Sequence, residues 1–544
     1  MKRILFLVVL FASACSQHPS AEKVIFGKIW TGDDKQSVVE GIAINADTIV
    51  ATGTRSDIQE WVGEGTVVTE APSGGLVVPG FIDSHTHFVT GGLALLSIQL
   101  RDAKTREEFI NRFKEYAARQ TPGTWIMGGD WDHMNWGGEL PTKEWIDSVT
   151  RNNPVWVNRL DGHMSLANTA AMKAAGLTDK VGDIPGGTVV RDKKGRATGV
   201  FKDNAQEWIN PKVPELSEAI QDKALDTAMR YVASKGVTSA HNMYGYTRAF
   251  ERAHDAGRMI TRIYAVENLS DWSNLKSKVE QQGHGDKWLR YGGLKGFVDG
   301  SLGSHTAAFF KPFTDAPTDS GFFITPEKDL YEWASAADKA GLQVMIHAIG
   351  DKAINTLLNI FDRIEKENGP RDRRFRIEHA QHLSPEDIDR FKSLGVIASM
   401  QPYHAIDDGR WAEKVIGRER SKTTYAFGSL MKAGARVAFG SDWFVAPPTP
   451  LEGIYAAVTR RTLDDKNPNG WIPEEKITVA QALKAYTLDA AYASFEERIK
   501  GSLERGKLAD LVVLDQDILT IAPEQIRGVK VRGTMVGGTW VWER

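Results

Sequence analysis

The pattern of apolar and polar positions differs between the two ends of the chain and its middle. At both ends, short runs alternate apolar and polar residues and are separated by turns rich in Gly, Asp and Asn, which is typical of strands with one buried face. These runs lie at 23–30, 41–45, 48–51 and 66–70 and again at 511–514, 528–532 and 539–543. The pattern predicts one small β-domain, a β-sandwich built from both chain ends over residues 22–78 and 500–544.

In the middle of the chain, short apolar runs alternate with helical stretches such as 217–235, 327–340 and 353–368. A repeated strand and helix is the pattern of parallel βα units. The candidate strands are 80–87, 236–242, 262–266, 293–299, 343–347, 375–379, 396–401 and 436–442. Eight such units favour an α/β fold with a closed (β/α)₈ TIM barrel over residues 79–88 and 217–499.

One connection is much longer than a βα loop requires. Residues 89–216 follow the first candidate barrel strand, are rich in Trp, Gly and Asp, and contain a strand-like run of their own at 155–159. Loops after barrel strands lie on the face where barrel active sites form. We therefore expect an inserted subdomain over the active site.

Residues 1–21 have the pattern of an export signal followed by a tether. A basic start, an apolar run at 4–11 and small residues at 12–14 precede Cys15, which is the only cysteine. The run is too short to span a bilayer, and the small residues before Cys15 resemble a bacterial lipoprotein cleavage box. We expect an exported protein, either an outer-membrane lipoprotein that faces the periplasm through a lipid on Cys15 or a plainly secreted periplasmic protein.

The length of the chain bears on the number of domains, and its charge bears on the classes of binding partner. A chain of 544 residues is too long for a single ordinary core, and its 67 basic and 70 acidic residues give a net charge of −3. This balance gives no electrostatic reason to expect nucleic acid or an anionic membrane surface as a partner. Membrane contact is expected only through the lipid on Cys15, and association into a homo-oligomer stays open.

The candidate chemistry lies at the ends of the expected barrel strands. His85 and His87 alternate on the first strand and therefore point to the same face, which makes half of a divalent-metal site. His347, His379 and Asp442 each end a further apolar run. Because barrel chemistry is placed at the carboxyl ends of the strands, we expect these residues to form one metal site.

Lys295 stands inside the otherwise apolar run 293–299. An inward lysine is rarely buried without a partner. Two interpretations stay open at this point: a salt bridge to Asp299 or another acid, or entry of Lys295 into the metal site.

Several longer motifs surround these residues. They are PGFIDSHTH at 79–87, DGH at 161–163, DGSLGS at 299–304, HAIGD at 347–351, EHAQ at 378–381, GSDW at 440–443 and GKLADLVVL at 506–514. Together they resemble the amidohydrolase superfamily, specifically its N-substituted formamide deformylase-like (YtcJ-like) branch, over nearly the whole chain after the signal. The resemblance implies a metal-dependent amidohydrolase that cleaves a non-peptide C–N bond of a small-molecule amide through a metal-bound hydroxide.

The resemblance also implies two divalent metal ions, with zinc as the expected element and a single ion as the alternative. The implied ligands are His85, His87, Lys295, His347, His379 and Asp442. Lys295 matches the lysine that is carboxylated in binuclear members and bridges both ions. A zinc ion lowers the pKa of its bound water to about 7. Asp442 would take the proton from the nucleophile and deliver it to the leaving nitrogen.

Further residues are candidates for contacts with the substrate or for hydrogen bonds that orient a ligand. His163, in the expected insertion, is a candidate catalytic contact to the substrate or its oxyanion, with a structural histidine as the alternative. The others are Asp299, His305, Asp351, His382 and His404. His305 stands where family members often carry Arg, which indicates either a different specificity or a surface substitution without consequence.

Other functions stay open because a fold does not fix the bond that is cleaved. An esterase, a lactonase or a phosphotriesterase-type hydrolase would use the same site. A non-catalytic envelope lipoprotein that binds a ligand in a retained barrel is the alternative outside enzymes.

Overall fold

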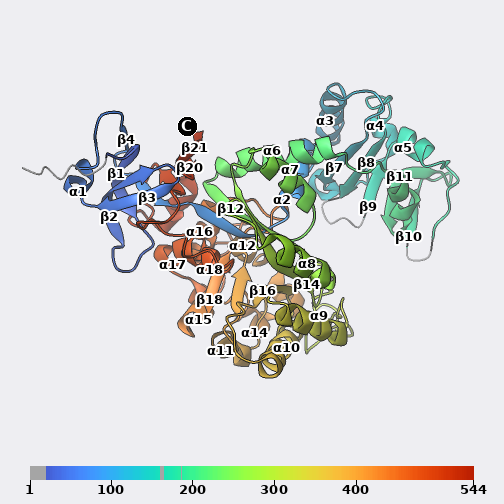
Figure 1. Cartoon of the computed structure of the whole chain (residues 1–544). Coiled ribbons are helices and arrows are strands. Elements are labelled where there is room, and N and C mark those ends of the chain that lie inside the picture. The colour runs from blue at the N-terminus through green and yellow to red at the C-terminus, as the bar shows by residue number, and fades with distance from the viewer. Residues whose placement is uncertain (1–19, 160–163, 185–186) are drawn as a thin grey trace, which may run out of the picture.

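The computed structural model in Figure 1 describes residues 20–159, 164–184 and 187–544. It consists of a central barrel and two further sheets, one built from the chain ends and one in the long connection after the first barrel strand. The expected signal with Cys15 and the expected substrate contact His163 lie outside the described residues. Among the described residues, no helix has both the length and the hydropathy needed to cross a membrane.

The barrel contains eight parallel strands that neighbour each other in chain order. They are β6 (Phe81–Thr86), β12 (Val237–Asn242), β13 (Arg262–Asn268), β14 (Leu289–Phe297), β15 (Gln343–Ala348), β16 (Arg376–His379), β17 (Ile397–Met400) and β18 (Arg436–Phe439). Each corresponds to one of the eight apolar runs. The predicted parallel barrel is therefore confirmed as a nearly closed eight-stranded sheet.

Helices cover the barrel. The main ones are α6 (Glu218–Ala233), α7 (Thr247–Asp255), α8 (Trp272–Gln282), α9 (Glu327–Lys339), α10 (Asp351–Asn368), α11 (Ile388–Ser393), α15 (Phe427–Lys432), α16 (Pro450–Thr459), α17 (Val479–Ala485) and α18 (Leu488–Tyr492). In α10 the residues Ile354, Leu357, Phe361 and Ile364 recur at helical spacing and are all buried, so one apolar stripe faces the strands.

The first and last barrel strands are joined mainly by side-chain and loop contacts. The carboxylate of Asp83 on β6 accepts hydrogen bonds from the backbone N–H of Ser441, at 2.8 Å, and from its hydroxyl, at 2.6 Å. The next N–H along the chain, that of Asp442, donates to the carbonyl of His85 at 2.8 Å. These bonds fix the segment after β18 against β6.

The two chain ends share one mixed sheet of eight strands. They are β1 (Lys23–Trp30), β2 (Val38–Asn45), β3 (Thr48–Gly53), β4 (Val67–Glu70), β5 (Leu76–Pro79), β19 (Leu511–Leu514), β20 (Val531–Val536) and β21 (Thr539–Glu543). The antiparallel pair of β5 and β19 joins the two ends, and Figure 1 shows blue and red strands together there. The strand expected at 528–532 begins only at Val531, because Pro523–Gly528 forms a 3₁₀ helix. The sandwich arrangement of this sheet stays a prediction.

The long connection begins with α2 (Phe88–Leu96) and carries a five-stranded sheet in the order β10-β11-β9-β8-β7. Its strands are β7 (Ile126–Trp131), β8 (Val155–Arg159), β9 (Met164–Ala167), β10 (Gly187–Arg191) and β11 (Ala197–Asp203), with helices α3 (Arg106–Ala117), α4 (Lys143–Ile146) and α5 (Thr169–Ala174). Figure 1 shows this part, in cyan, to one side of the barrel. The domain boundaries expected from the sequence, and a position of the insertion over the site, stay predictions.

Candidate metal centre

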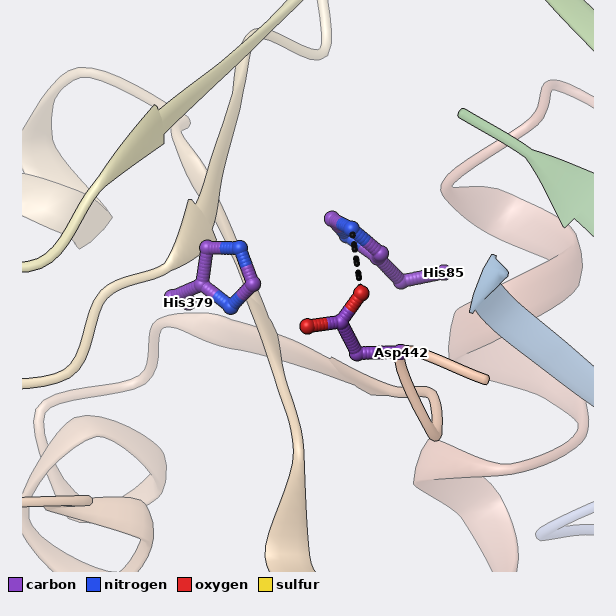
Figure 2. A group of neighbouring side chains, drawn as sticks. All are labelled: His85, His379 and Asp442. Carbon is purple, nitrogen blue, oxygen red and sulfur yellow. Dashed lines mark ion pairs between the residues drawn. The ribbon is translucent and has the colours of Figure 1, made fainter. Parts of the chain in front are cut away.

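Three side chains from separate strand ends meet in the barrel. His85 lies on β6, His379 ends β16, and Asp442 follows β18. Each offers one donor atom, and these atoms lie within 4.8 Å of one another. Figure 2 shows His85 and Asp442 joined as an ion pair, with Nε2 of His85 at 3.5 Å from Oδ1 of Asp442, and the His379 ring facing them. All three are buried, so the group is enclosed by protein.

Hydrogen bonds leave one ring nitrogen of each of these histidines available. Nδ1 of His85 lies 2.6 Å from Oε2 of Glu378, and Nδ1 of His379 lies 2.8 Å from Oε1 of Gln401. Both partners are acceptors, so each Nδ1 carries the proton and each Nε2 keeps its lone pair. Nε2 of His85 is buried and has no hydrogen-bond partner among the described residues. A metal ion in the group would satisfy this atom.

His347 on β15 is hydrogen-bonded through its other ring nitrogen, Nε2. Its Nε2 lies 3.0 Å from the carbonyl oxygen of Gly300, so Nδ1 keeps the lone pair. Its ring centroid is 4.5 Å from that of His379. Asp299 lies beside it, with Oδ1 at 3.6 Å from Nε2 of His347. The carboxylate of Asp299 accepts backbone hydrogen bonds from Ala308, Ile349 and Gly350 and so holds the loops around this histidine.

His87 completes the cluster at the side that is open to solvent. Its Nε2 lies 3.3 Å from Oδ1 of Asp442, and its side chain is 24% exposed. Asp442 has a φ of 58°, a left-handed conformation that non-glycine residues rarely adopt. Such strained residues concentrate at functional sites, and here the conformation accompanies a carboxylate that contacts both His85 and His87.

Lys295 on β14 lies inside the barrel next to these groups. It is 2% exposed, and its Nζ lies 4.9 Å from the ring centroid of Phe297. Burial lowers the pKa of Lys295 to about 8. It makes no ion pair with any residue in the described ranges, so the salt bridge to Asp299 considered from the sequence is not observed there. Entry of Lys295 into the metal site stays a prediction.

The electrostatics of the group suit a divalent cation. Burial and the charge of Lys295 lower the pKa of His85 to about 4 and that of His347 to about 3, so both are neutral at pH 7. Burial raises the pKa of Asp442, but the hydrogen bond from His87 and the nearby His85 outweigh burial and leave the pKa well below its ordinary value. Neutral imidazoles and an ionised carboxylate are the donor set that zinc takes. The residues present therefore fit the implied metal.

A buried ion pair stands behind His85. Nε of Arg376 lies 2.7 Å from Oε1 of Glu378, and both side chains are fully buried. Arg376 also donates to the carbonyl of Ser84 at 2.6 Å and lies 3.0 Å from Nδ1 of His241. Burial raises the pKa of Glu378, but Arg376 and the hydrogen bond from His85 outweigh it and keep the pKa well below its usual range. Neither residue was among the site residues predicted from the sequence, where charges at alternate positions of an apolar strand were the available signal.

The expected ligands open into one cavity of about 950 Å³ at the carboxyl ends of the strands. Aromatic residues line part of it, among them Tyr244, Phe297, Trp411 and Phe444. The remaining polar lining includes Arg101, Gln381, His404, Asp407 and Asp408. A cavity with an apolar wall and a few converging polar groups is typical of a small-molecule site.

Of the other candidate residues, His404 belongs to the cavity lining, whereas His382, His305 and Asp351 do not. His382 is buried, with Nδ1 at 2.8 Å from Oγ1 of Thr424. Nε2 of His305 lies 2.9 Å from Oδ1 of Asp315, and Asp351 begins α10. Their roles stay predictions.

Known proteins similar to this chain include amidohydrolases and a metal-dependent hydrolase. The model of the amidohydrolase family matches residues 73–542. Protein LONG AFTER FAR-RED 3 of Arabidopsis thaliana is 39% identical over 527 residues, which cover 94% of this chain and 90% of that protein. The N-substituted formamide deformylase of Arthrobacter pascens is 25% identical over 541 residues, covering 96% of this chain and 98% of that protein. A crystal structure described as an uncharacterized metal-dependent hydrolase from Pyrococcus horikoshii OT3 has a TM-score of 0.77 and 28% identity, covering 92% of this chain and 99% of that chain.

Proposed function

This chain belongs to the amidohydrolase family and is a metal-dependent hydrolase, and on that premise we propose that it cleaves a non-peptide C–N bond of an amide or formamide. The observation that carries the proposal is the buried group of His85, His379 and Asp442, in which each histidine keeps one free lone pair. The choice of bond is supported by the similarity to N-substituted formamide deformylase, which extends over nearly the whole of both chains.

We propose two divalent ions, with zinc as the element. His85, His87 and Asp442 would hold one ion, and His347 and His379 would hold the other. Lys295, buried beside them and without an ion pair in the described part of the chain, would serve as a further ligand once its neutral amine adds CO₂ and loses a proton to form a carbamate. Bound zinc supplies a Lewis acid for the carbonyl and an activated water at neutral pH.

The side chains around the ions would transfer protons, orient the ligand rings and contact the substrate. Asp442 is ionised at neutral pH and would accept the proton of the attacking water, then donate it to the leaving nitrogen. Glu378 and Gln401 fix the rings of His85 and His379, so the lone pairs point in constant directions. His163 is our candidate for the contact to the substrate oxyanion.

The test is a hydrolysis panel with the zinc-loaded enzyme. Formamides, N-acyl amines, cyclic amides and dipeptide-like amides are assayed beside esters, lactones and phosphotriesters. We expect turnover of at least one amide and a loss of about 10²- to 10⁴-fold in Asp442→Asn, the range for removal of a general acid–base group. Turnover confined to esters, lactones or phosphotriesters would contradict the C–N assignment. Metal binding without any turnover would favour a binding protein.

We also propose that the chain is exported and lipidated on Cys15, which is supported by the sequence pattern of residues 1–21. The full chain expressed in a Gram-negative bacterium should incorporate a labelled fatty acid, and Cys15→Ala should not. Equal labelling of both would contradict lipidation at this residue.

A further inference from the structure

The wall of the active-site cavity carries a carboxylate that makes no ion pair with a lysine or an arginine among the described residues. Asp408 is the last residue of α12 (Pro402–Asp408) and lines the cavity together with the expected metal ligands. Its Oδ2 accepts hydrogen bonds from the hydroxyl of Tyr425, at 2.6 Å, and from Nε2 of Gln381, at 2.9 Å. In the part of the chain that the structure describes, neither an ion pair nor a hydrogen bond to Oδ1 is found. Removing an anion from water without a counter-charge is costly, so such a group calls for a partner.

The surroundings hold Asp408 in a fixed position. Tyr425 is fully buried, and its carbonyl accepts a hydrogen bond from Nη1 of Arg460 at 2.8 Å. Gln381 is also buried and stands two residues after His379, so Asp408 is linked by one side chain to the strand end that carries a metal ligand. The two donors on Oδ2 orient the carboxylate and leave Oδ1 as the oxygen available to a ligand.

The neighbouring groups suit a positive charge. Trp411 lines the same cavity, and its backbone N–H donates to the carbonyl of Asp408 at 2.9 Å, so the indole and the carboxylate are held by one turn. Aromatic faces attract ammonium groups. His404 lies one helical turn before Asp408 and also lines the cavity, with an Nε2 that has no hydrogen-bond partner among the described residues.

Among the described residues, no lysine or arginine of the lining pairs with Asp408. Asp407, the neighbouring acid, is occupied by an ion pair with Arg410. Arg101, from the long connection, is exposed and makes no ion pair with Asp408. Burial raises the pKa of Asp408, while the charge of His404 and the hydrogen bonds from Tyr425 and Gln381 oppose this effect. A bound cation would remove the remaining cost of ionising the carboxylate.

We propose that Asp408 binds a protonated amine of the substrate, so that the enzyme acts on amides which carry a primary or secondary ammonium group. This inference rests on the proposed amide hydrolysis for its catalytic readout. The ammonium would donate to Oδ1 of Asp408 and lie against the ring of Trp411. The amide carbonyl of the same molecule would then reach the metal ligands at the ends of β6 and β16.

The first test compares two acetamides of equal length, N-(4-aminobutyl)acetamide and its neutral counterpart N-pentylacetamide. We expect the zinc-loaded wild type to prefer the ammonium substrate by about 10- to 100-fold in kcat/KM, the range for a hydrogen bond to a charged group. Asp408→Asn should abolish this preference, since its amide oxygen can still accept from Tyr425 and Gln381 while its NH₂ group faces the cavity. Asp407→Asn is the matched control and should keep the preference. An equal kcat/KM for both acetamides in the wild type would overturn the proposal.

The second test does not depend on turnover. Binding of n-butylammonium to the zinc-loaded protein is measured by calorimetry, with n-butanol as the neutral probe. We expect the wild type and Asp407→Asn to bind the ammonium more tightly than Asp408→Asn by the same factor, with no such difference for n-butanol. Tighter binding to the wild type in a protein that hydrolyses no amide would uphold the ammonium site and reject the proposed function. Equal binding by all three proteins would overturn the ammonium site whatever the protein hydrolyses.

Discussion

Nδ1 of His85 lies 2.6 Å from Oε2 of Glu378, and Glu378 is in turn paired with Arg376 in the interior of the barrel. This arrangement links a fully buried ion pair to the metal centre. Arg376 keeps the glutamate ionised, and the glutamate fixes both the tautomer and the ring orientation of His85. The lone pair on Nε2 is thereby directed at Asp442 and His379 before any metal binds.

Replacing Glu378 should therefore weaken metal binding. Glu378→Gln keeps the shape of the side chain but removes the charge that orients His85 and compensates Arg376. We expect the affinity for zinc to fall by about 10- to 100-fold, as for other groups that orient a ligand histidine. Competition with a chromogenic chelator measures this affinity. Glu332→Gln, at an exposed glutamate of α9 paired with Lys328, is the control and should leave the affinity unchanged. Equal affinities for both variants would show that Glu378 does not position His85.

The contrast between His85 and Glu378 shows what the sequence could supply. His347, His379 and Asp442 were predictable because each ends an apolar run, and His85 because it alternates with His87 on the first strand; parallel βα units bring such strand ends to one face. The role of Glu378 was not predictable, because it depends on the contact of its side chain with His85 on another strand and with Arg376 two residues earlier. Sequence periodicity cannot show which residue lies across the barrel from it.

Asp408 was harder to find for a different reason. It lies on a short helix in the connection after β17, and neither period nor motif marks it. Its position depends on Tyr425 and Gln381, which are brought to it only by the folded chain.

The start of β14 also differs from the predicted strand. The strand begins at Leu289 rather than at 293, because the additional residues pair with β13.

Asp299 should contribute mainly to stability. Its two oxygens accept three backbone N–H groups from the loops after β14 and β15, so Asp299→Asn would place an amide NH₂ against a donor. We expect a loss of about 1–3 kcal/mol in the free energy of unfolding, the cost of an unsatisfied buried polar group. Urea titration of the metal-free protein measures it. Asp362→Asn, at an exposed ion pair with Lys366, should change the free energy little. Equal urea midpoints for Asp299→Asn and the wild type would show that these three hydrogen bonds do not stabilise the fold.

His382 should make the stability depend on pH. Burial and the charge of Arg420 lower the pKa of His382 to about 3 in the folded protein. Between pH 6.5 and 3 the unfolded chain binds a proton that the folded chain resists, so stability that is present above pH 6.5 is lost as the pH falls. The expected slope from this group is about 1.4 kcal/mol per pH unit.

The matching experiment compares His382→Gln with the wild type, both metal-free, by chemical unfolding between pH 6.5 and 4. The variant should lose stability less steeply than the wild type as the pH falls. His254→Gln is the control, because His254 is partly exposed, and its pKa is raised by Asp286. A slope for His382→Gln as steep as that of the wild type would mean that His382 takes up its proton in the folded state.

The central claim is that strand-end side chains of one barrel bind metal, and elemental analysis of the purified, signal-free protein tests it most directly. We predict about two zinc ions per chain after zinc reconstitution and dialysis, the binuclear state of a metal hydrolase. His85→Ala should lower this content and Lys295→Met should leave one ion, whereas the surface variant His254→Ala should retain both. A wild type that binds no metal, or a content that His85→Ala does not change, would contradict the metal centre described for this protein.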